Sequence, residues 1–188
     1  IAGYSNTPNL ERPVAPEYTL QKHSVWEESF RSETGKIQAF WGSSPSDVFA
    51  VGENGSIFHY NGISWKMMFS KTTDPLFAIW GFSANSIYVV GTRIMLYYDG
   101  SEWMKKKLYF PEHFTSIWGT SEGNLWMTSL EGHIWKKGHE DDWDMYVPCG
   151  ICPSFTAVYG LPTGEVYVVG SDGTLWLGYK GYFHPMSI

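Results

Sequence analysis

The tetrapeptide Ala39-Phe40-Trp41-Gly42 opens a pattern that recurs along the chain and decides its fold. The pattern returns as Ala78-Ile79-Trp80-Gly81, Ser116-Ile117-Trp118-Gly119 and Ala157-Val158-Tyr159-Gly160. The four aromatic residues lie 39, 38 and 41 positions apart, and chance does not place four such matches in register. A period of about 40 residues indicates a repeat architecture, in which each repeat is one supersecondary unit.

Each tetrapeptide is followed by three further apolar runs at matching distances. The second runs are residues 47–52, 86–91, 124–129 and 165–170, and the third runs are 56–60, 94–98, 133–136 and 174–177. Turn sequences such as Glu53-Asn54-Gly55 separate the second run from the third, which is typical of two-strand hairpins. A further turn leads into a fourth run that carries Trp65, Trp103 or Trp143. One repeat therefore predicts four short antiparallel strands.

The second run of each repeat indicates how the sheets are arranged. Residues 48–51 and 166–169 are apolar on both faces rather than alternating, as in a strand whose sheet is covered on both sides. Blades arranged radially supply this cover, because each blade lies between two neighbours. We therefore predict an all-β chain that forms a small β-propeller, with four blades of four antiparallel strands. Two local departures are expected: Ile94 near the usual turn glycine predicts a shortened or bulged hairpin, and Ser129 replaces a glycine.

The N-terminal part of the chain suggests how the ring closes. Trp26 lies 15 residues before Trp41, the same spacing as from Trp65 to Trp80. The last repeat offers only residues 181–185 as a fourth strand, and Pro185 is a poor donor in a ladder. We expect the strand around Trp26 to complete the final blade. Residues 1–23 are then an extended N-terminal arm, and residues 24–188 are the β-propeller.

The repeat also has a family resemblance. The succession of Trp41-Gly42, residues 47–52 (Asp-Val-Phe-Ala-Val-Gly), residues 55–62 and Ser64-Trp65 resembles the short Trp-Gly and Ala-Val-Gly β-propeller repeats of bacterial secreted and envelope proteins. The resemblance covers about residues 26 to 183. It implies a propeller fold, and it implies a role in binding or scaffolding rather than a specific activity.

Charge and hydropathy exclude some classes of partner. The net charge is −6, with only three arginines, so the chain lacks the clustered basic face that a nucleic-acid binder needs. No apolar run approaches the roughly 20 residues that span a bilayer, so we expect no transmembrane segment in this chain.

Cys149 and Cys152 are the only cysteines, and they lie close together. A local disulfide between them is favoured, with free thiols as the alternative. A redox motif is disfavoured because the flanking prolines do not open a helix, and a zinc site would need a second pair of ligands. A disulfide would indicate an oxidising compartment, so we expect an extracytoplasmic protein, periplasmic, in the outer envelope or secreted, and bacterial.

The sequence shows no pattern that predicts chemistry. The histidines stand at different positions in their repeats, whereas a metal on the propeller axis would need matching ones: His23, His59, His113, His133, His139 and His184. The acidic run 139–144 lacks the spacing of a calcium loop and is interpreted as a solvated turn. Only Arg93 lies where a sialidase-like arginine cluster would need one. We predict no catalytic residues, no metal and no cofactor.

These observations favour a non-catalytic protein-interaction or scaffold propeller, a subunit or accessory of an extracytoplasmic complex with protein partners. Phe, Trp and Tyr make up 18% of the chain, which keeps a carbohydrate-binding, lectin-like propeller as the alternative. A glycosidase-type propeller enzyme is the second alternative. The four repeats fit either a complete ring or part of a larger one.

Overall fold

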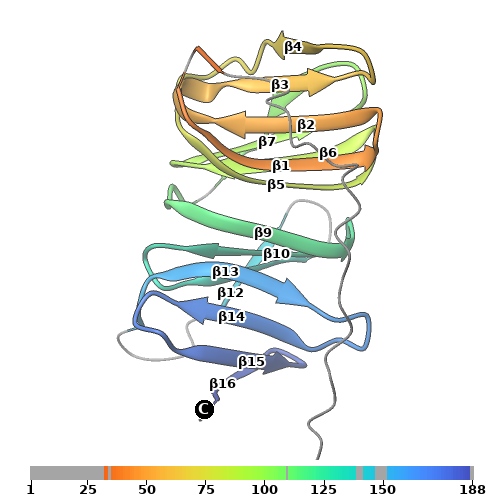
Figure 1. Ribbon diagram of the computed structural model, residues 1–188. Helices are drawn as coiled ribbons and strands as arrows, with labels where there is room; N and C mark the ends of the chain where they lie inside the picture. The colour runs from red at the N-terminus through yellow and green to blue at the C-terminus, as the bar shows by residue number, and fades with distance from the viewer. Residues whose placement is uncertain (1–31, 34, 109, 139–141, 147–151, 187–188) are drawn as a thin grey trace, which may run out of the picture. The chain divides into compact units, whose positions relative to one another are not determined.

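A computed structural model describes residues 32–33, 35–108, 110–138, 142–146 and 152–186. These residues form four sheets, each of four antiparallel strands that follow one another in sequence, which confirms the predicted fold class. Within this part of the chain the sheets succeed one another from β1–β4 to β13–β16 (Figure 1). We call them the first to fourth blades.

The strand bounds follow the four predicted runs of each repeat. The first blade contains β1 (Ile37–Ser44), β2 (Asp47–Gly52), β3 (Ile57–Tyr60) and β4 (Trp65–Met68). The second contains β5 (Leu76–Ser83), β6 (Ser86–Gly91), β7 (Ile94–Tyr98) and β8 (Trp103–Lys105). The third contains β9 (Phe114–Ser121), β10 (Asn124–Ser129), β11 (Ile134–Lys137) and β12 (Trp143–Tyr146). The fourth contains β13 (Phe155–Gly160), β14 (Val166–Gly170), β15 (Leu175–Tyr179) and β16 (Tyr182–Pro185).

The hairpins between second and third strands differ as the sequence predicts. In the first blade a single 3-10 turn, η1 (Glu53–Gly55), joins β2 to β3, with Asn54 and Gly55 at positive φ. In the second blade β6 ends at Gly91 and β7 begins at Ile94, so the loop is only Thr92-Arg93. Arg93 takes a φ of 58°, the left-handed conformation that such a tight loop requires. The expected shortening of this hairpin is confirmed.

The core lies between the blades rather than inside any one of them. Side chains alternate along each strand, so one set packs on the preceding blade and the other set on the following blade. In β6, Ile87 and Val89 belong to a cluster shared with the first blade, whereas Tyr88 and Val90 belong to one shared with the third. A further cluster joins the third blade to the fourth. Among the described residues, none of these clusters joins the fourth blade to the first.

The Trp-Gly pairs make contacts between the first strands of neighbouring blades. The ring of Trp41 lies over Gly81 of the second blade, and the ring of Trp118 lies over Gly160 of the fourth. Between them, Trp80 Nε1 donates a hydrogen bond to the carbonyl oxygen of Gly119 at 2.9 Å. A Cβ atom on Gly81 or Gly160 would lie 2.6 or 2.3 Å from the ring above it. The glycine is therefore required by the tryptophan of the preceding blade.

The fourth blade has its own outermost strand. β16 pairs with β15 in antiparallel register from Tyr179↔Tyr182 to Trp176↔Pro185. Pro185 stands at the end of this ladder, at the blade's outer strand, where a missing N–H donor is tolerated. The predicted closing strand around Trp26 and the boundary between residues 23 and 24 lie outside the described residues, and both stay predictions.

The contact between ring and glycine can be tested at Gly160. We expect Gly160→Ala to lower the free energy of unfolding by about 1–3 kcal/mol, because the new methyl group overpacks the Trp118 ring. Gly123→Ala is the matched control, since a Cβ there meets no atom within 4 Å, and its effect should stay within about 0.5 kcal/mol. Urea unfolding followed by Trp fluorescence measures both. Equal midpoints for the two variants would contradict the contact.

Candidate functional site

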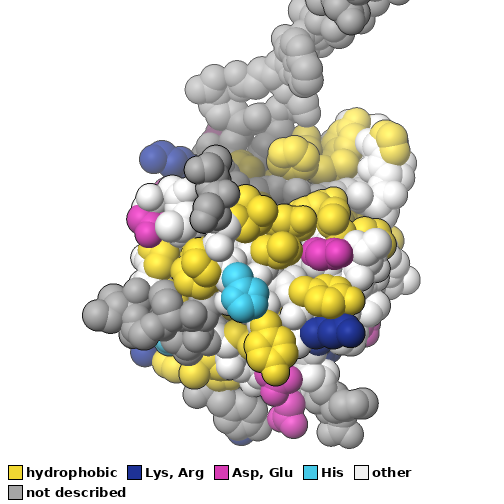
Figure 2. Space-filling view, turned by 90° about the horizontal axis from the view of Figure 1, so that it is seen from below, with side chains coloured by type: hydrophobic (Ala, Val, Ile, Leu, Met, Phe, Trp, Pro, Cys, Tyr) yellow, Lys and Arg dark blue, Asp and Glu magenta, His cyan; other side chains and the backbone are white. Residues whose placement is uncertain are grey.

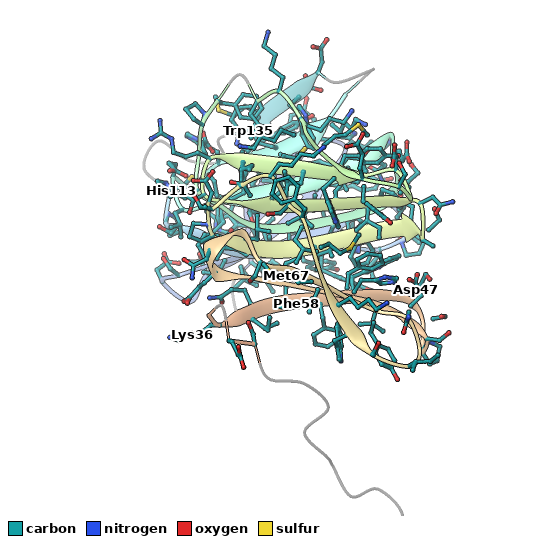
Figure 3. The ribbon with its side chains drawn as sticks, turned by 90° about the horizontal axis from the view of Figure 1, so that it is seen from above. Lys36, Asp47, Phe58, Met67, His113 and Trp135 are labelled. Atoms are coloured by element: carbon teal, nitrogen blue, oxygen red, sulfur yellow. The ribbon has the colours of Figure 1, made fainter. Side chains whose placement is uncertain are left out.

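The blades present two opposite edges on which a site can form. One edge carries the loops between first and second strands and between third and fourth strands, and Asp47 lies there. The other edge carries the loops between second and third strands and the connections between blades. Lys36 and His113, each just before a first strand, lie on this second edge, away from Asp47 (Figure 3).

A pocket of about 290 Å³ opens on the Asp47 edge at the junction of the third and fourth blades. Aromatic rings line it from both blades: Trp118 and Trp126 from the third, and Tyr179 from the fourth. Lys136 and Lys180 also line it, one from each blade. It therefore combines apolar ring surface with two cations, although the whole chain carries a net charge of −6.

Local contacts hold these side chains in place. Trp126 Nε1 donates a hydrogen bond to Asn124 Oδ1 at 3.1 Å, which orients the indole that forms one wall. Lys136 Nζ lies 5.2 Å from the centre of that indole, and Lys180 Nζ lies 5.3 Å from the centre of the Tyr179 ring. Such cation–π contacts keep the ammonium groups against the aromatic walls while they remain able to bind an anion.

The rim of the pocket depends on backbone shapes that glycine allows. Gly164, in the loop between β13 and β14, has a φ of 106°, and Gly181, in the loop between β15 and β16, has a φ of 85°. Both loops bound the pocket on the side of the fourth blade. The arrangement suits an anionic group that is joined to an apolar or planar group, because the lysines attract the charge and the rings cover the rest.

A second polar cluster lies on the opposite edge and was not found from the sequence. Glu112 accepts hydrogen bonds from Trp135 Nε1 at 2.8 Å and contacts His133 Nδ1 at 2.6 Å. In the neighbouring positions of the same two loops, His113 Nδ1 lies 2.7 Å from Glu131 Oε1. These residues join a connection between blades to the hairpin of the third blade, so the cluster ties the loops of this edge together. The histidines at unmatched repeat positions are thus partly accounted for as partners of glutamates.

The remaining predicted residues fall in separate places. Cys152 packs against the cluster between the third and fourth blades, whereas Cys149 lies outside the described residues, so their disulfide stays a prediction. His59 contacts Asp47 at 2.6 Å on the first blade, and His184 is exposed on β16. His23 and His139 also lie outside the described residues.

In the part of the chain that the structure describes, no three His, Cys, Asp or Glu side chains are placed to hold a metal ion. No helix there has the length and apolarity to cross a bilayer.

Comparison with known proteins places the fold. No protein-family model matches the chain. No curated protein matches it either. Among solved structures it is similar to YCF48 bound to a D1 peptide (19% identity, TM-score 0.63, 82% of this chain and 55% of that one). It is also similar to YCF48 from Cyanidioschyzon merolae (15% identity, TM-score 0.69, 88% and 61%).

Two further solved structures share the fold. One is a catalytically inactive virginiamycin B lyase from Staphylococcus aureus with quinupristin (10% identity, TM-score 0.55, 74% of this chain and 54% of that one). The other is the computationally designed Ika4 protein (15% identity, TM-score 0.61, 82% and 99%). These likenesses show a β-propeller fold. The chain spans between one half and two thirds of the length of the YCF48 chains.

The polar cluster makes a prediction about acid stability. Burial alone would raise the pKa of Glu131, but hydrogen bonds from the His113 side chain and from the backbone N–H groups of Glu131 and His113 hold that pKa below its ordinary 4.5. The carboxylate therefore stabilises the folded chain above pH 4.5, and this stabilisation is lost as the pH falls through the lower, folded-state pKa.

We expect Glu131→Gln to be less stable than the unsubstituted chain at pH 6 by about 0.2–1 kcal/mol, since the group is partly exposed. The difference should shrink steadily once the pH is lowered below 4.5. Urea unfolding at a series of pH values measures it. A difference that stays constant down to the acid limit would show that the carboxylate of Glu131 has no favourable partner.

Proposed function

We propose that this chain is a non-catalytic protein-interaction propeller that binds an acidic segment of a partner protein in the pocket between its third and fourth blades. The observation that carries the proposal is the pairing of Lys136 and Lys180 with the aromatic walls formed by Trp126 and Tyr179. Both ammonium groups attract a carboxylate that enters the pocket, and the apolar part of the same residue or its neighbour can contact the Tyr179 ring.

The fold supports a peptide ligand. A YCF48 structure of the same fold contains a bound D1 peptide, so this architecture can hold a peptide in that protein. In the present chain the pocket lies on an edge made of short loops rather than on a sheet face. An extended peptide can lie along that edge and insert one acidic side chain, without displacing any strand.

The finer parts of the proposal rest on separate observations. The fold alone does not imply a non-catalytic role, because YCF48 and a virginiamycin B lyase have the same fold. The non-catalytic role is therefore part of the proposal. The resemblance to the Trp-Gly repeats of bacterial envelope proteins supports a subunit or accessory of an extracytoplasmic complex. The predicted bridge between Cys149 and Cys152 supports the same location. The Tyr179 ring, which is 49% exposed, also suits the apolar face of a sugar ring, and this keeps a lectin-like role as the second candidate.

The test is a binding measurement with defined peptide pools. A fluorescent pool of short peptides rich in Asp, Glu and Leu is compared with a pool in which Asn and Gln replace the acids. We expect the acidic pool to bind, with affinity that falls as salt is raised. Lys180→Glu and Tyr179→Ala should each weaken binding by about tenfold, the usual effect of losing one charged or aromatic contact.

Matched variants make the result specific to the pocket. Lys66→Glu reverses the charge of an exposed side chain on β4 of the first blade, far along the chain from the pocket. This variant should leave binding unchanged. Equal binding of the two pools, or equal loss in Lys66→Glu and Lys180→Glu, would refute the acidic-peptide proposal. Binding to a neutral glycan on an array, lost in Tyr179→Ala and kept in Lys180→Glu, would favour the lectin-like role.

A further inference from the structure

The connection between the first and second blades turns an aromatic side chain outward. Phe69, which directly follows β4, is 80% exposed, and Met67, two residues earlier, is 59% exposed. The connection between the second and third blades does the opposite, because its Phe110 stacks on Trp135 with the ring centres 3.4 Å apart. Single exposed apolar side chains are ordinary on a protein surface, so the meaning of Phe69 depends on what surrounds it.

The loop that carries Phe69 is held by hydrogen bonds and close packing. Ser70 is buried, and its hydroxyl donates a hydrogen bond to the carbonyl oxygen of Thr72 at 3.2 Å. That carbonyl oxygen packs on Gly55, where a Cβ atom would lie only 2.1 Å from it. Thr72 Oγ1 in turn donates a hydrogen bond to Asp74 Oδ2 at 2.8 Å. Phe69 therefore projects from a preorganised loop, and a partner can bind it without first ordering the chain.

Phe69 forms one wall of an open cleft of about 460 Å³. Lys71, from the same connection, and Lys105, the last residue of β8, line the cleft together with Thr72 and Thr73. Lysine ammonium groups and threonine hydroxyls are common partners of phosphate oxygens in proteins. The cleft thus places groups that can bind a phosphate directly beside an exposed aromatic ring.

The surroundings of this cleft are basic, although the whole chain carries a net charge of −6. Residues 105–107 are three consecutive lysines, so with Lys71 they bring four of the chain's 13 Lys and Arg residues to the cleft or next to it. Two carboxylates oppose them: Glu102 forms an ion pair with Lys71, and Asp74 lines the cleft. The lysines outnumber these carboxylates, so this part of the surface attracts anions.

We propose that the Phe69 patch, made of Phe69, Lys71 and Lys105, docks on an anionic lipid bilayer. Phe69 enters the boundary between headgroups and acyl chains, and the two lysines bind the lipid phosphates. An aromatic side chain beside lysines is the combination that holds a protein at an anionic membrane interface. A soluble polyanion would engage the lysines, but only a bilayer offers a hydrocarbon layer to Phe69. This docking surface lies on the first two blades and is separate from the peptide pocket between the third and fourth.

The opposite end of the blade series provides a control for simple exposure of aromatic side chains. Tyr182, on β16 of the fourth blade, is 73% exposed, and Tyr159 is 59% exposed. Figure 2 shows that end, where hydrophobic side chains surround a histidine. Tyr182 matches Phe69 in aromatic character and exposure, but it does not line the basic cleft.

The test is co-sedimentation of the full chain with lipid vesicles. Vesicles of phosphatidylcholine alone are compared with vesicles of equal parts phosphatidylcholine and phosphatidylglycerol. We expect binding to the anionic vesicles only, with affinity that falls as salt is raised. Phe69→Ser and Lys105→Glu should each weaken this binding by about tenfold. Both side chains are exposed, so the urea midpoints of the two variants should equal that of the unsubstituted chain.

Two further variants separate this surface from the rest of the molecule. Tyr182→Ser removes an exposed aromatic ring outside the patch and should leave vesicle binding unchanged. Lys180→Glu, which disrupts the peptide pocket, should also keep vesicle binding, whereas Lys105→Glu should keep the binding of acidic peptides. The two proposals can therefore fail independently of each other.

Several outcomes would overturn the membrane proposal. No binding to the anionic vesicles, or equal binding to both compositions, would do so directly. Loss of binding in Lys105→Glu but not in Phe69→Ser would show ionic contact without insertion, and would assign the patch to a soluble polyanion instead. An equal loss in Tyr182→Ser or Lys180→Glu would place the lipid contact on the fourth blade.

Discussion

The structure depends on one kind of contact, in which the tryptophan of one blade packs on the Trp-Gly glycine of the next: Trp41 and Trp118 lie over Gly81 and Gly160, and Trp80 donates a hydrogen bond to Gly119. The ring needs the glycine because no Cβ atom fits beneath it at Gly81 or Gly160. Burying one such ring removes about 150–250 Å² from water, worth roughly 4–6 kcal/mol as an upper bound. A four-stranded blade has no core of its own, so these junctions supply most of the apolar burial that keeps the chain folded.

The same contact positions the candidate site. Trp118 packs on Gly160 and is also one of the residues that line the pocket. The junction that joins the third blade to the fourth therefore also shapes the pocket. Lys136 and Lys180 come from neighbouring blades and line one pocket only because the blades are packed in this order. Variation in a few loop residues can thus change what the pocket binds without disturbing the interior, which is the usual way that propellers acquire function.

Much of the fold could be predicted from the sequence, because a propeller repeats its pattern in every unit. The Trp-Gly period predicts four blades, and the position of Ile94 predicts the short hairpin at Arg93. The pocket could not be predicted, since Lys136 and Lys180 lie in different repeats and only the packing of the blades brings them together. The contacts of Glu112 with His133 and Trp135 were missed because Glu112 lies in the connection before β9, and only the fold brings that connection to the hairpin of the third blade.

The most direct test of the ring-on-glycine contact is a double-mutant cycle between Trp118 and Gly160. A Cβ at position 160 would meet Trp118 Cζ3 at 2.3 Å and Cη2 at 2.5 Å, and Trp118→Phe removes both atoms. If the contact controls the junction, Gly160→Ala should cost at least about 1 kcal/mol less in the Trp118→Phe background than in the unsubstituted chain. The same cost in both backgrounds would show that Gly160 is required for some other reason, and the account of how the blades are joined would fail.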